Sequence, residues 1–148
     1  MVCDIRFASD TARFTTAFAN RGLIAEHGIS WILPRLIGSA HALDLLLSGR
    51  VIDSEEAAKI GIVNRTFTSD RLLDESTNYV KGLAERSAPV SMKVIKQQVY
   101  RHLSSSLGEA ARESIELMAE SLKRPDFREG VLSYIEKRPP KFTRLSSK

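Results

Sequence analysis

Cysteine is almost absent from this sequence, because Cys3 is the only one in 148 residues. A lone cysteine cannot form an intramolecular disulfide or a thiolate-rich metal site, so a disulfide-stabilised fold and a zinc-finger-like site are excluded. The reducing cytoplasm is the compartment that this cysteine usage predicts. The histidines His27, His41 and His102 also lack the spacing of zinc ligands, and we expect no metal.

Long apolar runs and charge blocks are missing too. No stretch approaches the ~20 consecutive apolar residues that a membrane-spanning helix needs. Asp4 and Arg6 lie where a signal peptide would have an apolar stretch. The net charge of +4 is spread along the chain, and no Lys/Arg block with interleaved aromatic residues occurs. Nucleic acid is therefore not an expected partner, whereas an anionic small molecule is compatible with the charge.

What remains is an ordinary globular composition, with 43% hydrophobic and 27% charged residues. A chain of this length suits one domain and can bury a real core. Alternating apolar residues favour three strands, at residues 2–9, 12–18 and 61–67. The first strand is unexpected, because the sequence offers few partner strands for it.

The other segments favour helices. Apolar residues recur at helical spacing and are bounded by capping residues, proline or glycine, and we expect helices at residues 28–34, 39–49, 53–61, 69–87, 89–103, 107–122 and 126–138. Asp53 with Glu56 resembles a capping box, and residues 139–148 read as a tail. We interpret the apolar stripes as core or subunit contacts rather than as a ligand groove.

Glu26 is the most unusual polar residue of the N-terminal third, because it lies in the apolar run "LIAEHGISWIL". Two interpretations are open. Its carboxylate could stabilise the N-terminus of the helix that begins near Gly28, and the pattern alone favours this. Alternatively it is a general acid or base, whose proton transfer near neutral pH would be helped by apolar neighbours. The adjacent His27 is a weaker catalytic candidate.

Five motifs occur in one order along the chain: Asp-Ile-x-Phe-Ala, Leu-Pro-Arg-Leu-x-Gly, Leu-Ser-Gly-Arg, Glu-Ala-x-x-x-Gly-x-Val-Asn and Tyr-Ile-Glu-Lys-Arg-x-Pro-x-Phe. Together they closely resemble the enoyl-CoA hydratase/isomerase family, also called the crotonase superfamily. The resemblance runs from Cys3 to about Phe142.

This resemblance implies the C-terminal portion of an α/β crotonase-like (ClpP/crotonase) fold, mostly helical with a few short strands. Residues 1–67 would be a remnant of the spiral core with the active-site segment. Residues 68–148 would be a helical region for oligomerisation and for covering CoA, and we treat the whole as one domain. Family members carry a long segment before this point that supplies both N–H donors of the oxyanion hole. We therefore expect a truncated crotonase that is inactive alone unless a partner restores these donors, because losing one such donor already costs about 100- to 1,000-fold in rate.

The resemblance also implies the reaction. Family hydratases use two glutamates; one would precede this chain and the other matches Phe18, which cannot transfer protons. Some family isomerases have their acidic residue eight positions later, where this chain has Glu26. We therefore expect a Δ3,Δ2-enoyl-CoA isomerase of fatty-acid metabolism rather than a hydratase, with Glu26 shuttling a proton between C2 and C4.

By the same resemblance, Phe18, Leu23 and Trp31 would line the acyl pocket, and Tyr134 and Lys137 would contact the CoA nucleotide. The CoA thioester is then the substrate and no cofactor is expected. Relatives form trimers or hexamers, so a homo-oligomer or a separate N-terminal half is an expected partner. The alternative is a catalytically inactive chain that acts only as an oligomerisation or partner-binding helical module.

Overall fold

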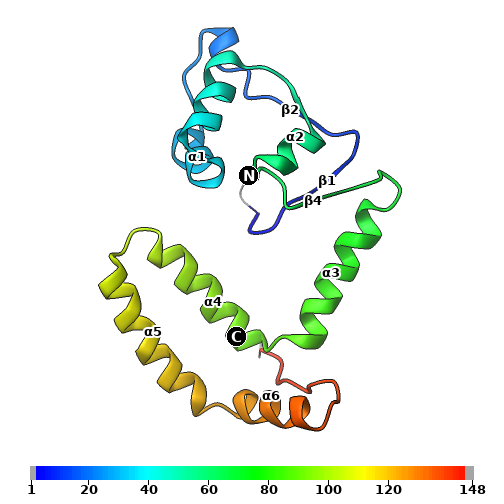
Figure 1. Cartoon of the computed structure of the whole chain (residues 1–148), viewed down its shortest axis with the longest axis vertical. Helices are drawn as coiled ribbons and strands as arrows, with labels where there is room; N and C mark the ends of the chain where they lie inside the picture. The colour runs from blue at the N-terminus through cyan, green and yellow to red at the C-terminus, as the bar shows by residue number, and fades with distance from the viewer. Residues whose placement is uncertain (1–2, 146–148) are drawn as a thin grey trace. The chain divides into compact units, whose positions relative to one another are not determined.

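The computed structural model describes residues 3–145, and the chain divides into two compact units. Unit 1 extends to Thr77 and unit 2 begins at Asn78, so that the boundary falls within helix α3 (Leu72–Arg86; Figure 1). The functional division expected between residues 67 and 68 stays a prediction.

Unit 1 combines short strands with two helices and a 3-10 turn. Its elements are β1 (Phe7–Ser9), β2 (Arg13–Phe14), η1 (Ala19–Arg21), α1 (Ile29–Ser48), β3 (Ile52–Asp53), α2 (Ser54–Lys59) and β4 (Arg65–Phe67). β1 pairs in parallel with β4, and β2 pairs antiparallel with β3. The three expected strands are present but shorter, β3 was not anticipated, and Val2 lies outside the described residues.

The first strand, for which the sequence offered few partners, pairs with β4. Phe7 aligns with Arg65 and Ser9 with Phe67, so the two strands are joined by a long crossover that contains both helices. Such a crossover is what parallel pairing requires. The rings of Phe7 and Phe67 also meet edge to face, with centroids 5.5 Å apart, an arrangement that aromatic pairs favour.

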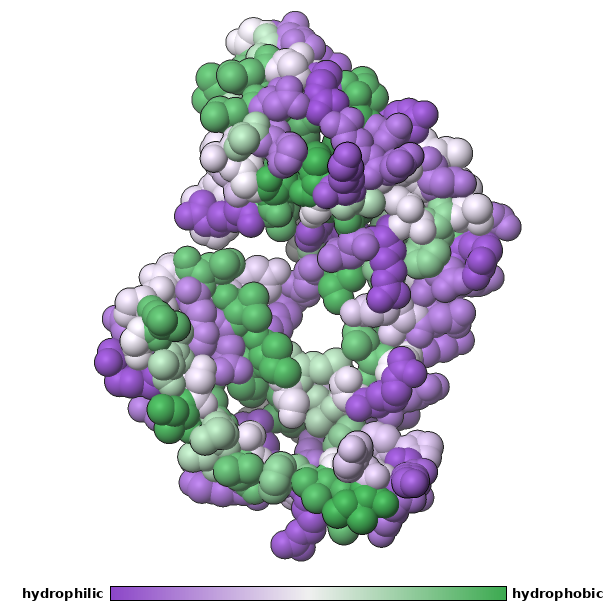
Figure 2. Space-filling view, in the orientation of Figure 1, coloured by the Kyte–Doolittle hydropathy of each residue, from purple (hydrophilic) through white to green (hydrophobic). Residues whose placement is uncertain are grey.

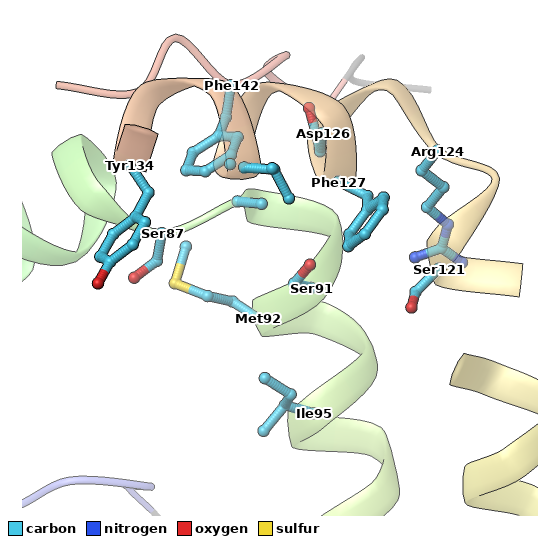
Figure 3. Close-up of a pocket in the computed structure, with 13 residues that line it drawn as sticks. Ser87, Ser91, Met92, Ile95, Ser121, Arg124, Asp126, Phe127, Tyr134 and Phe142 are labelled. Atoms are coloured by element: carbon cyan, nitrogen blue, oxygen red, sulfur yellow. The ribbon is translucent and has the colours of Figure 1, made fainter. Parts of the chain in front are cut away.

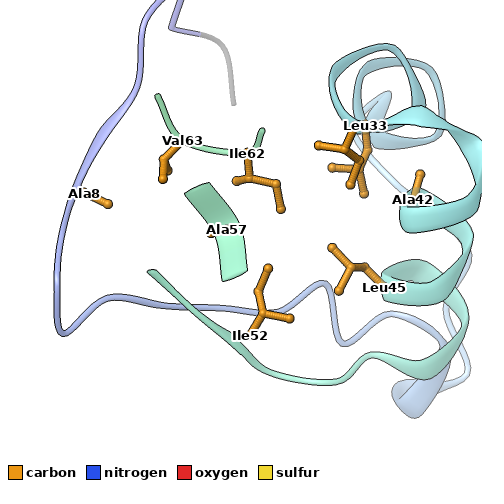
Figure 4. Close-up of a cluster of buried hydrophobic side chains, with 9 residues drawn as sticks. Ala8, Leu33, Ala42, Leu45, Ile52, Ala57, Ile62 and Val63 are labelled. Atoms are coloured by element: carbon orange, nitrogen blue, oxygen red, sulfur yellow. The ribbon is translucent and has the colours of Figure 1, made fainter. Parts of the chain in front are cut away.

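The core of unit 1 lies between α1, α2 and the segments around β3 and β4 (Figure 4). It consists of nine buried apolar side chains: Ala8, Leu33, Ile37, Ala42, Leu45, Ile52, Ala57, Ile62 and Val63. The residues that α1 contributes recur at spacings of three to five, so one stripe of that helix is buried. Leu33 and Ile52 are almost completely inaccessible to solvent.

Helix α1 joins two helices that the sequence predicts as separate. The first continues past Pro34 to Gly38, where φ is 78° and ψ is 159° and the helix kinks. That conformation is accessible essentially to glycine alone. The expected end of the first helix near Pro34 is therefore wrong, and Gly38 is the residue that separates the two parts.

The N-terminus of α2 is capped as the sequence predicts, although only in part. The Asp53 side chain accepts a hydrogen bond from the Glu56 N–H at 2.9 Å. The Glu56 carboxylate does not complete a capping box, because it pairs with the guanidinium of Arg50. The hydrogen bond from Arg50 holds the pKa of Glu56 below its usual value.

Unit 2 contains the rest of α3 and the helices α4 (Pro89–His102), α5 (Leu107–Leu122) and α6 (Pro125–Ile135). Proline stands at the start of α4 and of α6, where its missing N–H costs nothing. Ser106 and Glu109 form a complete capping box at α5. These helix starts follow the sequence prediction closely.

The helices of unit 2 bury little apolar surface. Among its described residues, the buried apolar side chain is Ala88. Apolar side chains along α4 and α5 stay largely accessible, and green surface is visible over these helices in Figure 2. Polar contacts help to join α4 to α5: the Glu113 carboxylate pairs with Arg101 at 2.7 Å and with His102 at 2.8 Å.

Candidate acid-base site

The segment between β2 and α1 carries Glu26 and is tied to the end of α1. The Thr15 hydroxyl donates to the Gly49 carbonyl and the Thr16 hydroxyl to the Leu45 carbonyl, both at 2.8 Å. The Glu26 carbonyl accepts the N–H of Ile29 at 3.0 Å. Both ends of the segment are therefore anchored on the same helix.

The chain enters α1 through two successive residues with positive φ, His27 at 54° and Gly28 at 73°. Gly28 is the N-cap residue and no side chain makes a capping hydrogen bond there. The first turn of α1 contains no acidic residue. A capping hydrogen bond from Glu26 is therefore not made, and its stabilisation of the helix through the dipole stays a prediction.

The Glu26 carboxylate is accessible to solvent, with 41% of the side chain exposed. Its Oε2 lies 3.7 Å from Nε2 of His27, whose side chain is 87% exposed. An ion pair this exposed contributes little to stability. The carboxylate is thus available for chemistry rather than committed to a structural contact.

The apolar residues expected around the substrate lie on the same segment and on the first turn of α1. Phe18 precedes η1 and is partly buried, whereas Leu23 is 47% and Trp31 54% exposed. The guanidinium of Arg35 lies 3.9 Å from the centroid of the Trp31 ring, a cation-π contact. Leu23 and Trp31 are therefore open to solvent within unit 1.

The two residues expected to contact the CoA nucleotide lie in unit 2. Tyr134 is near the end of α6 and 86% exposed, and it lines a hollow of about 640 Å³ between α4 and α6 (Figure 3). Lys137 follows α6 with a φ of 51°, and its N–H donates to the Tyr134 carbonyl at 3.3 Å. The roles expected for these residues and for Phe18, Leu23 and Trp31 stay predictions.

Sequence reasoning missed the hollow itself. Arg124, Phe127 and Phe142 line it together with residues of α4. The spacing of Phe127 and Val131 on one face of α6 was a usable signal, but the position of Phe142 depends on how the chain folds back after α6.

Among residues 3–145, no group of three or more His, Cys, Asp or Glu side chains is arranged to hold a metal ion. None of the helices in that part of the chain is both long enough and apolar enough to cross a bilayer.

The family model for enoyl-CoA hydratase/isomerase matches residues 1–145. This chain belongs to the enoyl-CoA hydratase/isomerase family. It is 36% identical over 143 residues to a protein named "Probable enoyl-CoA hydratase" of Mycobacterium bovis, covering 97% of this chain and 55% of that protein. It is 34% identical to a trans-2-decenoyl-(acyl-carrier-protein) isomerase of Streptococcus mutans, covering 97% and 54%. The chain thus spans about half the length of the curated relatives it matches.

Solved structures of this family give the same fold. A crystal structure titled as a probable enoyl-CoA hydratase/isomerase from Mycobacterium abscessus has a TM-score of 0.90 at 26% identity, covering 95% of this chain and 57% of the other. An enoyl-CoA hydratase from Mycobacterium smegmatis has a TM-score of 0.83 at 30% identity, covering 95% and 54%. The expected crotonase-like fold, mostly helical with few short strands, is confirmed.

Proposed function

We propose that this chain carries the acid-base segment of an enoyl-CoA isomerase, with Glu26 as the proton shuttle. The observation that carries the proposal is the Glu26 carboxylate, which is accessible and makes no capping hydrogen bond at α1. The isomerase named in Streptococcus mutans supports the same reaction class. Phe18 stands where family hydratases are expected to have their second glutamate, which argues against water addition.

The proposed reaction moves one proton and shifts one double bond. The Glu26 carboxylate removes a proton from C2 of a 3-enoyl thioester, and the electron pair is delocalised onto the thioester oxygen. The carboxylic acid so formed then returns the proton to C4, which yields the 2-enoyl thioester and restores the carboxylate. Donors for the oxyanion would come from a segment outside this chain.

The remaining expected residues complete the proposal. Phe18, Leu23 and Trp31 would contact the acyl chain, while Tyr134 and Lys137 would contact the CoA nucleotide by stacking and by charge. The CoA thioester is the substrate and no cofactor takes part. The single cysteine, Cys3, keeps the cytoplasm as the expected compartment.

A completed enzyme tests this function. This chain would be joined to the part of the Mycobacterium bovis relative that lies outside their match, and assayed with a 3-enoyl-CoA and separately with a 2-enoyl-CoA. We expect isomerisation without hydration, and a loss of about 100- to 10,000-fold in Glu26→Gln. Glu55→Gln, an exposed carboxylate on α2, is the matched control and should keep full activity. Hydration as the main reaction, or full activity of Glu26→Gln, would refute the proposal.

A second candidate function is an oligomerisation or partner-binding helical module. The accessible apolar residues of unit 2 favour it, because contiguous apolar surface of this kind is typical of an interface. Val99 on α4 and Ile115 on α5 are 55% and 62% exposed. If such a module operates, sedimentation should give a mass above that of a monomer, and Val99→Asp with Ile115→Asp should reduce it to the monomer. A folded monomer in the unmodified chain would eliminate this candidate.

A further inference from the structure

Unit 2 contains a hollow bounded by the first half of α4, by α6 and by the segment after α6 (Figure 3). Its volume of about 640 Å³ is typical of a small-molecule site. Its larger apolar lining residues are Met92, Ile95, Phe127, Val131, Tyr134 and Phe142. In Figure 3, Phe127 and Tyr134 point from α6 toward α4, where Met92 and Ile95 lie.

The wall that contains Phe142 is held by a set of polar contacts. The Glu129 carboxylate accepts hydrogen bonds from the Arg138 guanidinium at 2.6 and 3.0 Å and from the Lys141 N–H at 2.7 Å. Gly130 leaves room for the Phe142 ring, whose nearest atom would be 3.8 Å from a Cβ at that position. The chain after α6 is therefore fixed as a wall of the hollow.

In the described part of the chain, the hollow is lined by one basic and one acidic side chain, together with the hydroxyls of three serines and Tyr134. Arg124 is the only basic residue among the described residues that line it. The acidic one, Asp126, accepts the N–H of Thr143 at 3.2 Å, so its carboxylate is directed to the backbone. An apolar hollow with a guanidinium at one side matches a ligand that has an aliphatic chain and a negative end.

We propose that this hollow binds a fatty carboxylate, with its chain against Met92, Phe127 and Val131 and its carboxylate on Arg124. The site is separate from the proposed acid-base segment, because unit 1 contributes none of the residues that line it, and it shares only Tyr134 with the residues proposed to contact CoA. The free acid carries its charge directly at the end of the aliphatic chain, where it makes a charge-assisted hydrogen bond with Arg124, whereas a thioester group at that place is neutral and offers only the weaker acceptor of its carbonyl.

A fluorescent fatty acid tests the proposal on the 148-residue chain. The protein is titrated with 11-(dansylamino)undecanoate, and the probe is then displaced with decanoate or with methyl decanoate, which stands in for the neutral thioester. We expect saturable binding, and displacement by decanoate at roughly tenfold lower concentration than by the ester, because the charge-assisted hydrogen bond is made by the acid alone.

Two variants and two controls locate the site. Met92→Glu introduces a carboxylate into the apolar wall and should weaken binding of the probe at least tenfold. Arg124→Gln should remove the preference for decanoate while displacement by the ester is unchanged. Leu107→Glu, on α5 and 86% exposed, and Lys93→Gln, on α4, repeat these changes outside the hollow and should have no effect. Circular dichroism checks that each variant keeps its helices.

Three results would overturn the proposal. The first is the absence of saturable binding, and the second is equal displacement of the probe by the acid and the ester. The third is a loss of probe binding in Leu107→Glu as large as that in Met92→Glu, which would indicate that the probe adheres to apolar helix surface in general. Glu26→Gln should bind the probe as the unmodified chain does. Loss of isomerase activity in that variant is therefore distinguishable from loss of the fatty carboxylate site.

Discussion

The two units of this chain differ in how their elements are held. Unit 1 packs nine buried apolar side chains between its helices and short strands. Among the described residues of unit 2, the buried apolar side chain is that of Ala88. The helices of unit 2 depend more on polar interactions. These are the capping box of α5, the ion pairs of Glu113 with Arg101 and His102, and the hydrogen bonds that Glu129 accepts from Arg138. We infer that unit 1 has the more independent stability, and that unit 2 gains most from whatever covers its helices.

The largest expected effect is on the core of unit 1. Leu33 is completely buried, so Leu33→Ala removes transfer free energy and leaves a cavity, at a cost of about 2–5 kcal/mol. Leu107→Ala in unit 2 makes the same change at a side chain that is 86% exposed, and should alter stability by less than ~0.5 kcal/mol. Hydrogen exchange should show unit 1 alone losing protection. Equal losses from both variants would remove the contrast between the units.

Replacing a glycine by alanine should have opposite effects on stability in the two units. Gly38 has the positive φ at which α1 kinks, so Gly38→Ala should destabilise unit 1 by about 1–3 kcal/mol although its Cβ would meet nothing within 4 Å. Gly108 lies in the first turn of α5, where a Cβ would make an ordinary contact with Arg112 Nη1 at 3.9 Å, and Gly108→Ala should stabilise unit 2 by about 0.4–1 kcal/mol. Denaturant midpoints that shift in opposite directions would confirm this; a shift in the same direction would count against it.

The capping box of α5 should matter because unit 2 has little core. Ser106 accepts the Glu109 N–H at 3.3 Å, and its own N–H donates to the Glu109 carboxylate at 2.8 Å. Ser106→Ala should cost about 1 kcal/mol and lower the helicity measured by circular dichroism. Ser104→Ala, outside the box, is the control and should have no effect. Unchanged helicity in Ser106→Ala would show that α5 does not need its cap.

The smallest predicted effect is a pH dependence at the end of unit 2. The hydrogen bond from Arg138, and then that from the Lys141 N–H, lower the pKa of Glu129 from 4.5 to about 2. A depressed folded-state pKa contributes stability above the unfolded value, and that contribution is lost as the pH falls from about 4.5 to about 2. The protection of the Lys141 amide, measured as its exchange rate relative to the intrinsic rate at each pH, should therefore fall over this range. Glu129→Gln should show low protection at every pH, and protection that does not change with pH in the unmodified chain would contradict the assignment.

The sequence predicted the starts of α4, α5 and α6 well, because each start depends on a local residue preference. Pro89 and Pro125 occupy the first turns of α4 and α6, and Ser106 is the N-cap residue of α5. It predicted the strands less well, since their pairing is long-range: β1 meets β4 across the whole of α1 and α2. The first helix was expected to end near Pro34, whereas it continues to Gly38, whose backbone conformation produces the kink of α1.

The sequence singled out candidate residues for the site, and their roles stay predictions. Glu26 was singled out from its apolar neighbours, and the structure shows that the N-cap residue of α1 is Gly28. Two of the residues expected to line the acyl pocket, Leu23 and Trp31, are about half exposed within unit 1. Burial depends on what packs against these side chains, which a local pattern does not encode.

The central claim is that Glu26 carries the proton of the isomerisation. The most direct measurement is deuterium incorporation, by mass spectrometry, when the completed enzyme converts a 3-enoyl-CoA in D2O. We predict that part of the product formed by the unmodified enzyme carries deuterium at C4, because the Glu26 carboxylic acid exchanges its proton with solvent in some turnovers before it is delivered, and that Glu26→Gln forms almost no labelled product. Equal labelling by the two enzymes would show that another group moves the proton and would contradict the account.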